Sequence, residues 1–221
     1  MGRSLKYDIP GTDWRCTPLD LAERGVAGLF TGGSEGPKEV VLEVGFGRGE
    51  FLLEWAQRAP ATAFVGVEVS YKRVLKMARK VARAGLQNVR LLEGRGETIV
   101  RDLIEETSLR EVWVNFSDPW PKDRHADRRV IQSPFVTHVV RCLVPGGVLH
   151  VATDSPLYAA QIQSVLSAEL GLRNDFAPDA WRSQVPGRSP TGYEEEWRSK
   201  GRSLYFFDYR RRLQLGSASP S

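Results

Sequence analysis

The stretch Glu39–Glu50, EVVLEVGFGRGE, decides the fold class of this chain. Its first half, 39–44, is a short run rich in β-branched residues, which is typical of a buried strand. The segment GFGRG over 45–49 follows, and its alternating glycines predict a tight loop in which the backbone can approach a ligand closely. The next residues predict a helix over 50–59. A strand, a glycine loop and a helix in this order are typical of an α/β fold with a parallel sheet.

The alternation of strand and helix continues along the rest of the chain. Apolar runs predict strands over 39–44, 63–69, 88–92, 111–116, 148–153 and 203–209. Amphipathic segments predict helices over 50–59, 71–84, 97–106, 133–143 and 156–170. Since parallel strands need right-handed crossovers, we expect a mostly parallel central sheet with helices on both faces. The long polar segment 117–130 is expected to be a loop.

Three regions follow from this pattern. Residues 1–37 are polar and glycine-rich, which predicts a partly irregular N-terminal extension with at most one short helix near 19–23. This extension could cover a ligand, contact a partner or be dispensable. Residues 38–215 are expected to form the functional domain, and 216–221 a flexible tail.

Composition narrows the class of protein. The 221 residues are 41% hydrophobic and 26% charged, which excludes a mainly disordered chain. Two cysteines and three histidines cannot form a CxxC-type zinc site, so no metal is expected. No apolar run approaches the ~18 residues of a membrane span, and the first residues lack a signal-peptide core, so we expect a cytoplasmic location. The net charge of +4 permits a nucleic-acid partner.

The residues that follow the strands should carry the chemistry, because ligands bind at the carboxyl ends of a parallel sheet. A dinucleotide fingerprint, G-x-G-x-x-G, would need glycine at Glu50, and an acid there would repel a phosphate. The observed G-x-G-x-G, preceded by the strand acid Glu43, is instead similar to the S-adenosylmethionine loop of class I methyltransferases. Glu68, which ends the second strand, can accept hydrogen bonds from both ribose hydroxyls of a nucleoside.

Two later strands also end in acids. Asp118 lies in NFSDPWPK, and its Asp-Pro-Trp sequence resembles the Asp/Asn-Pro-Pro-Tyr element of amino-methyltransferases. The flanking prolines restrict the backbone there, so we expect Asp118 to be held in place. Asp154 follows the fifth strand and should line the same cleft, although an N-cap of the helix that starts at Pro156 is an alternative role.

Two basic segments are candidate contacts for RNA phosphates. The loop Lys122–Arg129 carries four basic residues, Lys122, Arg124, Arg128 and Arg129, together with two acidic residues and His125. In the helix over 71–84, Lys72, Lys76, Arg79 and Arg83 fall on one face with no acid between them. That face is either simply solvated or a stripe for an RNA backbone.

These motifs together resemble the bacterial tRNA (guanine-N7)-methyltransferase family. The matching elements, in family order, are EVGFGRGEF, GVEVS, NFSDPWPK, RHADRR, PGGVLHVATD and TGYEE. The resemblance implies a Rossmann-like class I methyltransferase fold with an antiparallel C-terminal strand. It implies an enzyme that transfers a methyl group from S-adenosyl-L-methionine to N7 of a guanosine in the tRNA variable loop. The partner would be tRNA, and the enzyme a monomer or homodimer.

The resemblance also implies roles for individual residues. Cofactor contacts would come from Glu43, Gly45, Gly47, Gly49, Glu68 and Asp118, with Asp118 as the catalytic residue. Substrate contacts would come from Lys122, Asp154, Thr191, Gly192, Tyr193 and Glu194. RNA contacts would come from Arg124, His125, Arg128 and Arg129. Trp120 or Tyr193 would stack on the guanine.

The chain departs from the family pattern at two places. The family has an Asp-Ala pair after the third strand for the adenine end of the cofactor, where this chain has Arg95-Gly96. Asp127 replaces a lysine in the basic loop. Two other functions stay open: a methyltransferase that acts on an amino group, and an RNA-binding module that keeps a cofactor pocket without turnover. A nicotinamide dehydrogenase is disfavoured by the glycine spacing.

Overall fold

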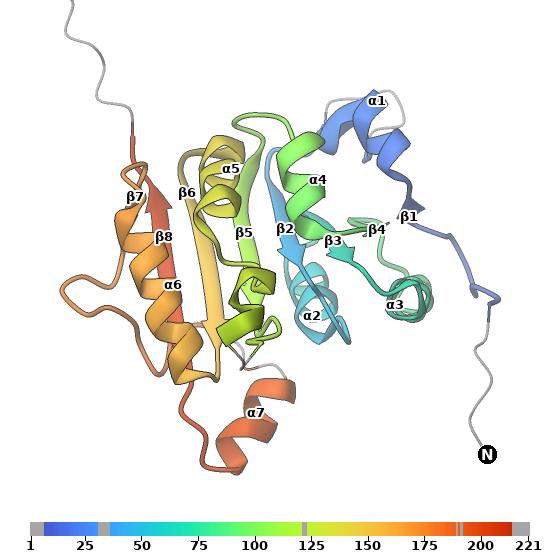
Figure 1. The fold of residues 1–221 in the computed structure, drawn as a ribbon. Helices are drawn as coiled ribbons and strands as arrows, with labels where there is room; N and C mark the ends of the chain where they lie inside the picture. The colour runs from blue at the N-terminus through green and yellow to red at the C-terminus, as the bar shows by residue number, and fades with distance from the viewer. Residues whose placement is uncertain (1–6, 31–35, 121–122, 189, 191, 214–221) are drawn as a thin grey trace, which may run out of the picture.

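One eight-stranded sheet forms the centre of the molecule, in the order β1-β4-β3-β2-β5-β6-β8-β7 (Figure 1). The computed structural model describes residues 7–30, 36–120, 123–188, 190 and 192–213. The strands are β1 (Arg15–Cys16), β2 (Val40–Val44), β3 (Ala63–Glu68), β4 (Val89–Glu93), β5 (Leu109–Asn115), β6 (Leu143–Thr153), β7 (Leu172–Asn174) and β8 (Tyr205–Arg211). All pairings are parallel except those of β8, which runs antiparallel to both β6 and β7. The predicted mostly parallel sheet with an antiparallel C-terminal strand is confirmed.

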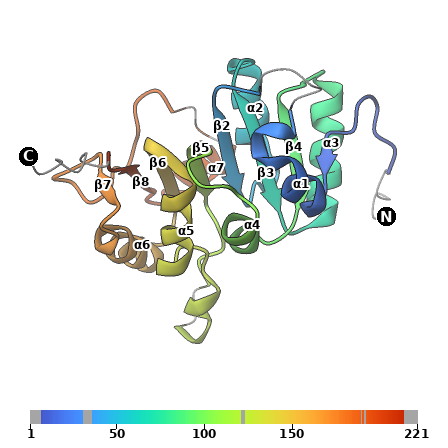
Figure 2. The ribbon, with the colours of Figure 1, turned by 90° about the horizontal axis from the view of Figure 1, so that it is seen from above.

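Helices cover both faces of this sheet (Figure 2). They are α1 (Pro18–Gly28), α2 (Glu50–Arg58), α3 (Tyr71–Arg83), α4 (Gly96–Asp102), α5 (Ser133–Cys142), α6 (Pro156–Ala168) and α7 (Gly192–Ser199), with the 3₁₀ helix η1 (Asp123–Arg128). Helices α1, α4, α5 and α6 bury their apolar residues in one core. Helices α2 and α3 bury theirs in a second core on the other face. The two cores explain why the central strands are buried along their whole length.

The order of the strands reverses beside β2. From β2 the chain runs outward through β3 to β4, and it then returns to β5 and β6 on the other side. The two half-sheets meet where β2 pairs with β5, with Glu43 opposite Trp113. This is the switch point at which parallel sheets bind ligands. The residues after Val44 and Asn115 therefore flank the expected site.

The N-terminal segment is more ordered than predicted. Strand β1 adds an eighth strand beside β4, and α1 extends to Gly28 where a short helix near 19–23 was expected. Gly25 has φ +68° and breaks α1, and the carboxylate of Glu105 accepts a hydrogen bond from Val26 N at 3.0 Å beyond the break. The second half of α1 thus depends on a residue 79 positions away, which no local pattern reveals.

Other boundaries differ by a few residues. Helix α4 ends at Asp102 rather than 106, because the chain turns at Leu103 and leads Glu105 toward α1. Strand β6 begins at Leu143, five residues before the predicted start, and its pairing with β5 shifts register between Leu109 and Glu111. The bulge accommodates the residues that lie between the predicted helix 133–143 and the predicted strand 148–153. Strand β7 and helix α7 were not predicted.

Candidate active site

The glycine loop between β2 and α2 presents an open backbone surface. Gly45, Gly47 and Gly49 all have positive φ, a conformation that other residues rarely adopt. A Cβ at Gly49 would lie 2.3 Å from Met77 Sδ, so this glycine is required by packing. A Cβ at Gly45 would meet no atom within 4 Å, and one at Gly47 only Gly45 O at 4.0 Å. Space therefore remains above the first two glycines for a ligand.

Glu68 at the end of β3 fixes the shape of this loop. Its Oε2 accepts a hydrogen bond from Gly47 N at 2.9 Å, and its Oε1 accepts one from Ser70 N at 3.0 Å. Arg73 Nη1 lies 3.5 Å from Oε2. The side chain is only 3% exposed. Since a carboxylate has about four acceptor positions, Glu68 keeps capacity for further donors.

Glu43 near the end of β2 is a buried carboxylate with one free oxygen. It is 2% exposed, and its Oε1 accepts a hydrogen bond from Asn115 Nδ2 at 3.0 Å. Its Oε2 has no hydrogen-bond partner. Burial raises the pKa of Glu43 to about 7, although the Asn115 hydrogen bond and the charge of Arg188 oppose the rise. A buried acceptor without a donor is costly and marks a place where a ligand donor fits.

A chain of polar groups connects Glu43 to helix α7. Arg188 Nη2 donates to Asn115 Oδ1 at 2.8 Å, and Arg188 Nε lies 3.6 Å from Glu194 Oε2. Arg198 also pairs with Glu194, at 3.1 Å. Burial lowers the pKa of Arg188, which packs over Trp113. The buried carboxylate of Glu194 thus pairs with two arginines and anchors α7, and the substrate contact expected of it stays a prediction.

The loop after β5 holds Asp118 in a strained segment. Phe116 and Trp120 have φ of +51° and +38°, values that bulky residues rarely adopt. Asp118 itself is exposed. Arg129 Nε donates to Pro119 O at 2.7 Å and Nη2 to Trp120 O at 3.1 Å. These contacts fix the backbone that directly follows Asp118.

Arg129 is the buried member of the basic loop. It is 7% exposed, its third nitrogen donates to Gln161 on α6, and its guanidinium packs over Tyr158. In this structure Arg129 therefore holds the loop after β5, and the RNA contact expected of it stays a prediction.

Asp118 follows β5 and Asp154 follows β6 at the carboxyl edge of the sheet, where Tyr193 packs against Phe116. Burial raises the pKa of the Tyr193 hydroxyl, and the charges of Asp154 and Asp118 add to this rise. Asp154 pairs with Arg202 at 2.6 Å. The N-cap of α6 is Ser155, so the alternative role of Asp154 as the helix cap is wrong.

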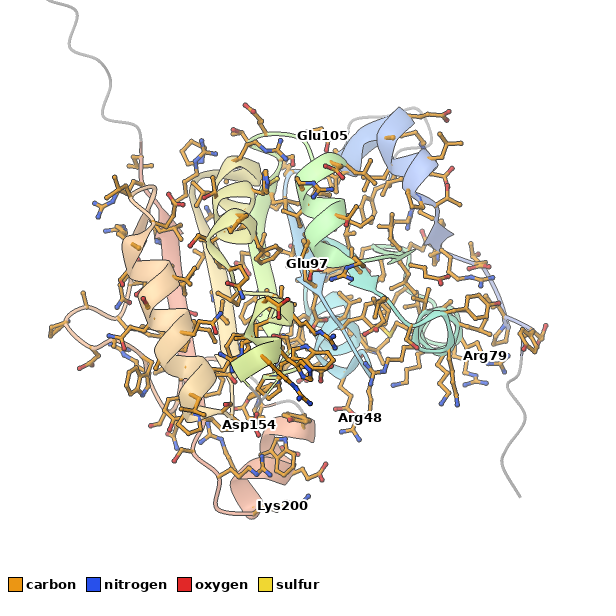
Figure 3. All side chains as sticks on the ribbon, viewed as in Figure 1. Arg48, Arg79, Glu97, Glu105, Asp154 and Lys200 are labelled. Carbon is orange, nitrogen blue, oxygen red and sulfur yellow. The ribbon has the colours of Figure 1, made fainter. Side chains whose placement is uncertain are left out.

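Helix α7 lies below this edge of the sheet (Figure 1). In Figure 3, Asp154 and Arg48 mark the two sides of the edge, and Lys200 marks the far end of α7. A Cβ at Gly192 would lie 2.8 Å from Glu50 Oε2, so the start of α7 contacts the start of α2. Phe116 and Tyr193 pack with ring centroids 4.9 Å apart. The start of α7 thus borders both the start of α2, which follows the glycine loop, and the loop after β5.

The remaining members of the basic loop lie on η1, which projects from the body of the molecule (Figure 2). Arg124 and Arg128 are exposed, and His125 is half-buried. Arg128 lies over the Trp120 ring at 5.2 Å, and His125 meets the same ring edge-on. Lys122 and Thr191, both expected to contact substrate, lie outside the described residues.

A cavity of about 640 Å³ lies at the ends of β3 and β4. Val69, Tyr71, Glu93 and Arg95 line it on one side, and the N-terminal segment 13–18 lines it on the other. Arg95 is exposed and lies 3.6 Å from Glu97. A Cβ at Gly96 would lie 2.2 Å from Val44 Cγ1, so packing against β2 explains the glycine of the Arg95-Gly96 pair.

The described residues contain no group of three or more His, Cys, Asp or Glu side chains that could hold a metal ion. No helix among them is long and apolar enough to cross a membrane.

Comparison with known proteins decides the family. The model of the family described as "Putative methyltransferase" matches residues 37–207. A curated relative, the tRNA (guanine-N(7)-)-methyltransferase of Halorhodospira halophila, is 38% identical over 90% of this chain and 86% of its own. This chain belongs to the tRNA (guanine-N7)-methyltransferase family. The resemblance inferred from the sequence is therefore confirmed.

Solved structures confirm the class I methyltransferase fold of this family member. The aminoglycoside resistance methyltransferase NpmB1 superimposes with a TM-score of 0.56 at 21% identity, over 92% of this chain and 97% of its own. A SAM-dependent methyltransferase from Aquifex aeolicus superimposes with a TM-score of 0.52 at 16% identity, over 80% and 85%.

Three polar residues of this methyltransferase were missed at the sequence level. Asn115 connects Glu43 to Arg188, and Arg202 pairs with Asp154. Asn115 opens the NFSDPWPK motif at a strand end, so its position carried a usable signal. Arg188 and Arg202 lie in irregular segments without periodicity, and only the folded chain shows their partners.

Proposed function

We propose that this chain transfers a methyl group from S-adenosyl-L-methionine to N7 of a guanosine in the variable loop of tRNA. Family membership supports the reaction, and one observation in the structure carries it to this site. The acids Glu43, Glu68, Asp118 and Asp154 lie at the carboxyl ends of the adjacent strands β2, β3, β5 and β6, and Glu68 accepts a hydrogen bond from the glycine loop.

The residues present fit the cofactor. The free oxygen of Glu43 suits an ammonium donor such as the amino group of a methionine moiety. Glu68 keeps acceptor positions for ribose hydroxyls, and Gly45 and Gly47 leave room for a close approach. The cavity beside Tyr71 and Glu93 suits an adenine ring. When bound, S-adenosylmethionine supplies an electrophilic sulfonium methyl group.

The chemistry at N7 asks for charge stabilisation rather than proton transfer. Guanine N7 has an in-plane lone pair and no proton, so no general base is needed. The guanine ring becomes cationic as N7 is methylated, and carboxylates near the ring favour that transition state. Asp118 and Asp154 supply this negative charge, and alignment of the guanine with the methyl group supplies the rest of the rate.

The same carboxylates select the base. Guanine presents N1–H and its 2-amino group as donors, which a carboxylate accepts, whereas adenine has no donor at N1. N7 lies in the deep groove of an RNA helix, so the base must be met in a loop or turned out of its stack. Trp120, which packs against Arg128 and His125, and Tyr193, which packs against Phe116, are the two candidates for stacking on it.

The test is methyl transfer from labelled S-adenosylmethionine to unmodified tRNA, followed by nucleoside analysis. Label in 7-methylguanosine, mapped to the variable loop, is the expected result. Label in an N-methylated exocyclic amine would show an amino-methyltransferase instead. Cofactor binding without transfer would favour the RNA-binding module. Asp118→Asn is the matched variant, since it keeps the shape of the side chain and removes its charge.

A further inference from the structure

The basic character of this chain is concentrated in helix α3. Its sequence, YKRVLKMARKVAR, contains six basic residues and no acidic residue. Six charges exceed the net charge of +4 carried by the whole chain, so the remaining residues together are slightly acidic. Such a concentration in 13 residues needs a physical reason, because neighbouring like charges on a helix repel one another.

The six charges lie on one face. At 100° per residue, they fall within an arc of about 120°. The opposite face packs Val74, Leu75, Met77, Ala78 and Val81 into the core. Within the arc, Arg79 is buried, Arg73 reaches Glu68 at 3.5 Å, and Lys80 Nζ donates to Arg48 O at 2.7 Å. Lys72, Lys76 and Arg83 remain exposed.

These three cations differ from three exposed arginines elsewhere on the molecule. Arg58, Arg101 and Arg173 each lie within 4 Å of an acid, Glu54, Asp102 and Asp175 respectively. In the part of the chain that the structure describes, no ion pair involves Lys72, Lys76 or Arg83. A row of unpaired cations is complementary to a row of anions outside the molecule.

The position of α3 connects this row to the proposed active site. The helix starts at Tyr71, three residues after Glu68, and therefore begins at the rim of the site. From there it extends for about 20 Å at 1.5 Å per residue. Figure 1 shows α3 toward the β4 side of the sheet, away from α7 and β8. An RNA held at Asp118 and Tyr193 could reach α3 only with a part distant from the methylated base.

We propose that Lys72, Lys76 and Arg83 form a phosphate-binding face for the tRNA backbone outside the variable loop. This inference rests on the proposed function for the identity of the RNA. An anionic lipid surface is the less suitable occupant, because a membrane-binding helix inserts an apolar face, and the apolar face of α3 is buried in the core. Phosphate contacts of this kind position the RNA without reading its sequence.

The experiment compares two triple variants with the wild-type protein. The first is Lys72→Gln/Lys76→Gln/Arg83→Gln, and the control is Arg58→Gln/Arg101→Gln/Arg173→Gln, which removes three paired cations and the same net charge. Direct binding of full-length tRNA and of a short hairpin with the target loop is measured at several salt concentrations. S-adenosylmethionine affinity and thermal unfolding are measured for each protein.

The first variant should bind full-length tRNA at least about 10-fold more weakly, with a salt slope lower by about 2 to 3. Its binding of the hairpin, its cofactor affinity and its unfolding midpoint should match those of the control. Equal tRNA affinity and salt slope in both variants would overturn the inference. The inference would also be overturned if the wild-type protein bound phosphatidylserine vesicles and the first variant alone lost this binding while its tRNA affinity stayed unchanged.

Failure of the proposed function has a different signature. A wild-type protein that binds tRNA through α3 but transfers no methyl group would contradict the proposed function and support the phosphate-binding face. If the wild-type protein methylates N7 and the first variant does so with an unchanged KM for tRNA, the result would support the proposed function and contradict the phosphate-binding face.

Discussion

Asp118 combines exposure with a fixed backbone, which is what a charge-stabilising carboxylate needs. Arg129 donates hydrogen bonds to the carbonyls of Pro119 and Trp120, which follow Asp118 in the chain. Burial raises the pKa of Tyr193, and the charge of Asp118 contributes to the rise. We predict that Asp118→Asn lowers the single-turnover rate by about 10²-fold, because the cationic guanine loses its counter-charge. Asp127→Asn, an exposed acid on η1, is the control. A wild-type rate in Asp118→Asn would remove the electrostatic role.

The protonation of the single carboxyl group of Glu43 affects both ligand binding and the free energy of unfolding. Burial raises the pKa of this carboxyl from 4.5 to about 7, so the folded state binds its proton more tightly than the unfolded chain does. The free energy of unfolding must therefore fall as the pH rises from about 4.5 to about 7, and the loss is complete above pH 7. The ligand-free protein therefore has a lower free energy of unfolding above pH 7, because a buried charged acceptor stays in the site.

Glu43→Gln should remove this loss of unfolding free energy. We predict that the variant unfolds with a free energy about 3 kcal/mol higher than wild type at pH 8, and with an equal one near pH 4. Its affinity for S-adenosylmethionine should fall, because the acceptor loses its charge. Urea unfolding at the two pH values and calorimetric binding check both effects, with Glu23→Gln as an exposed control. A gain of equal size at both pH values would contradict the assignment.

At the scale of elements, we expect two different tasks within the basic loop. Arg129 holds the loop after β5, and the exposed Arg124 on η1 contacts RNA. We predict that Arg129→Met lowers kcat by about 10-fold or more, since the Asp118 backbone loses its clamp, while the salt dependence of tRNA binding stays unchanged. Arg124→Gln should lower the salt slope by about 1 and leave kcat at saturating tRNA unchanged. Methylation kinetics over a salt series measure both, and a shared phenotype would show that the two arginines act alike.

The sequence could predict those features that depend on residues close together along the chain. The strands β2 to β6 and the acids at their ends follow from local apolar runs, so they were found together with their common edge. What was missed depends on partners far along the chain: β1 needs β4, the end of α1 needs Glu105, and Arg188 needs Asn115. The burial of Arg129 was also missed, because composition shows that a loop is basic but not which arginine is buried.

At the scale of the whole molecule, the N-terminal segment is part of the fold. Leu21, Val26 and Leu29 are buried in the larger core. Arg90 on β4 donates its Nε–H to Leu29 O at 2.8 Å, and its guanidinium lies 4.0 Å from the Trp14 ring centroid. Removal of this segment would expose core surface and leave a buried cation without its partners.

We therefore predict that deletion of residues 1–37 prevents folding. Three buried apolar side chains are worth about 1.5–3 kcal/mol each, which together approach the 5–15 kcal/mol that stabilise a typical domain. Deletion of residues 1–8, which precede every contact named above, should leave the unfolding free energy unchanged. Circular dichroism and urea unfolding of both truncations decide the matter. A folded, active 38–221 fragment would show that the sheet is complete without β1 and that the segment serves only to line the cavity at the ends of β3 and β4.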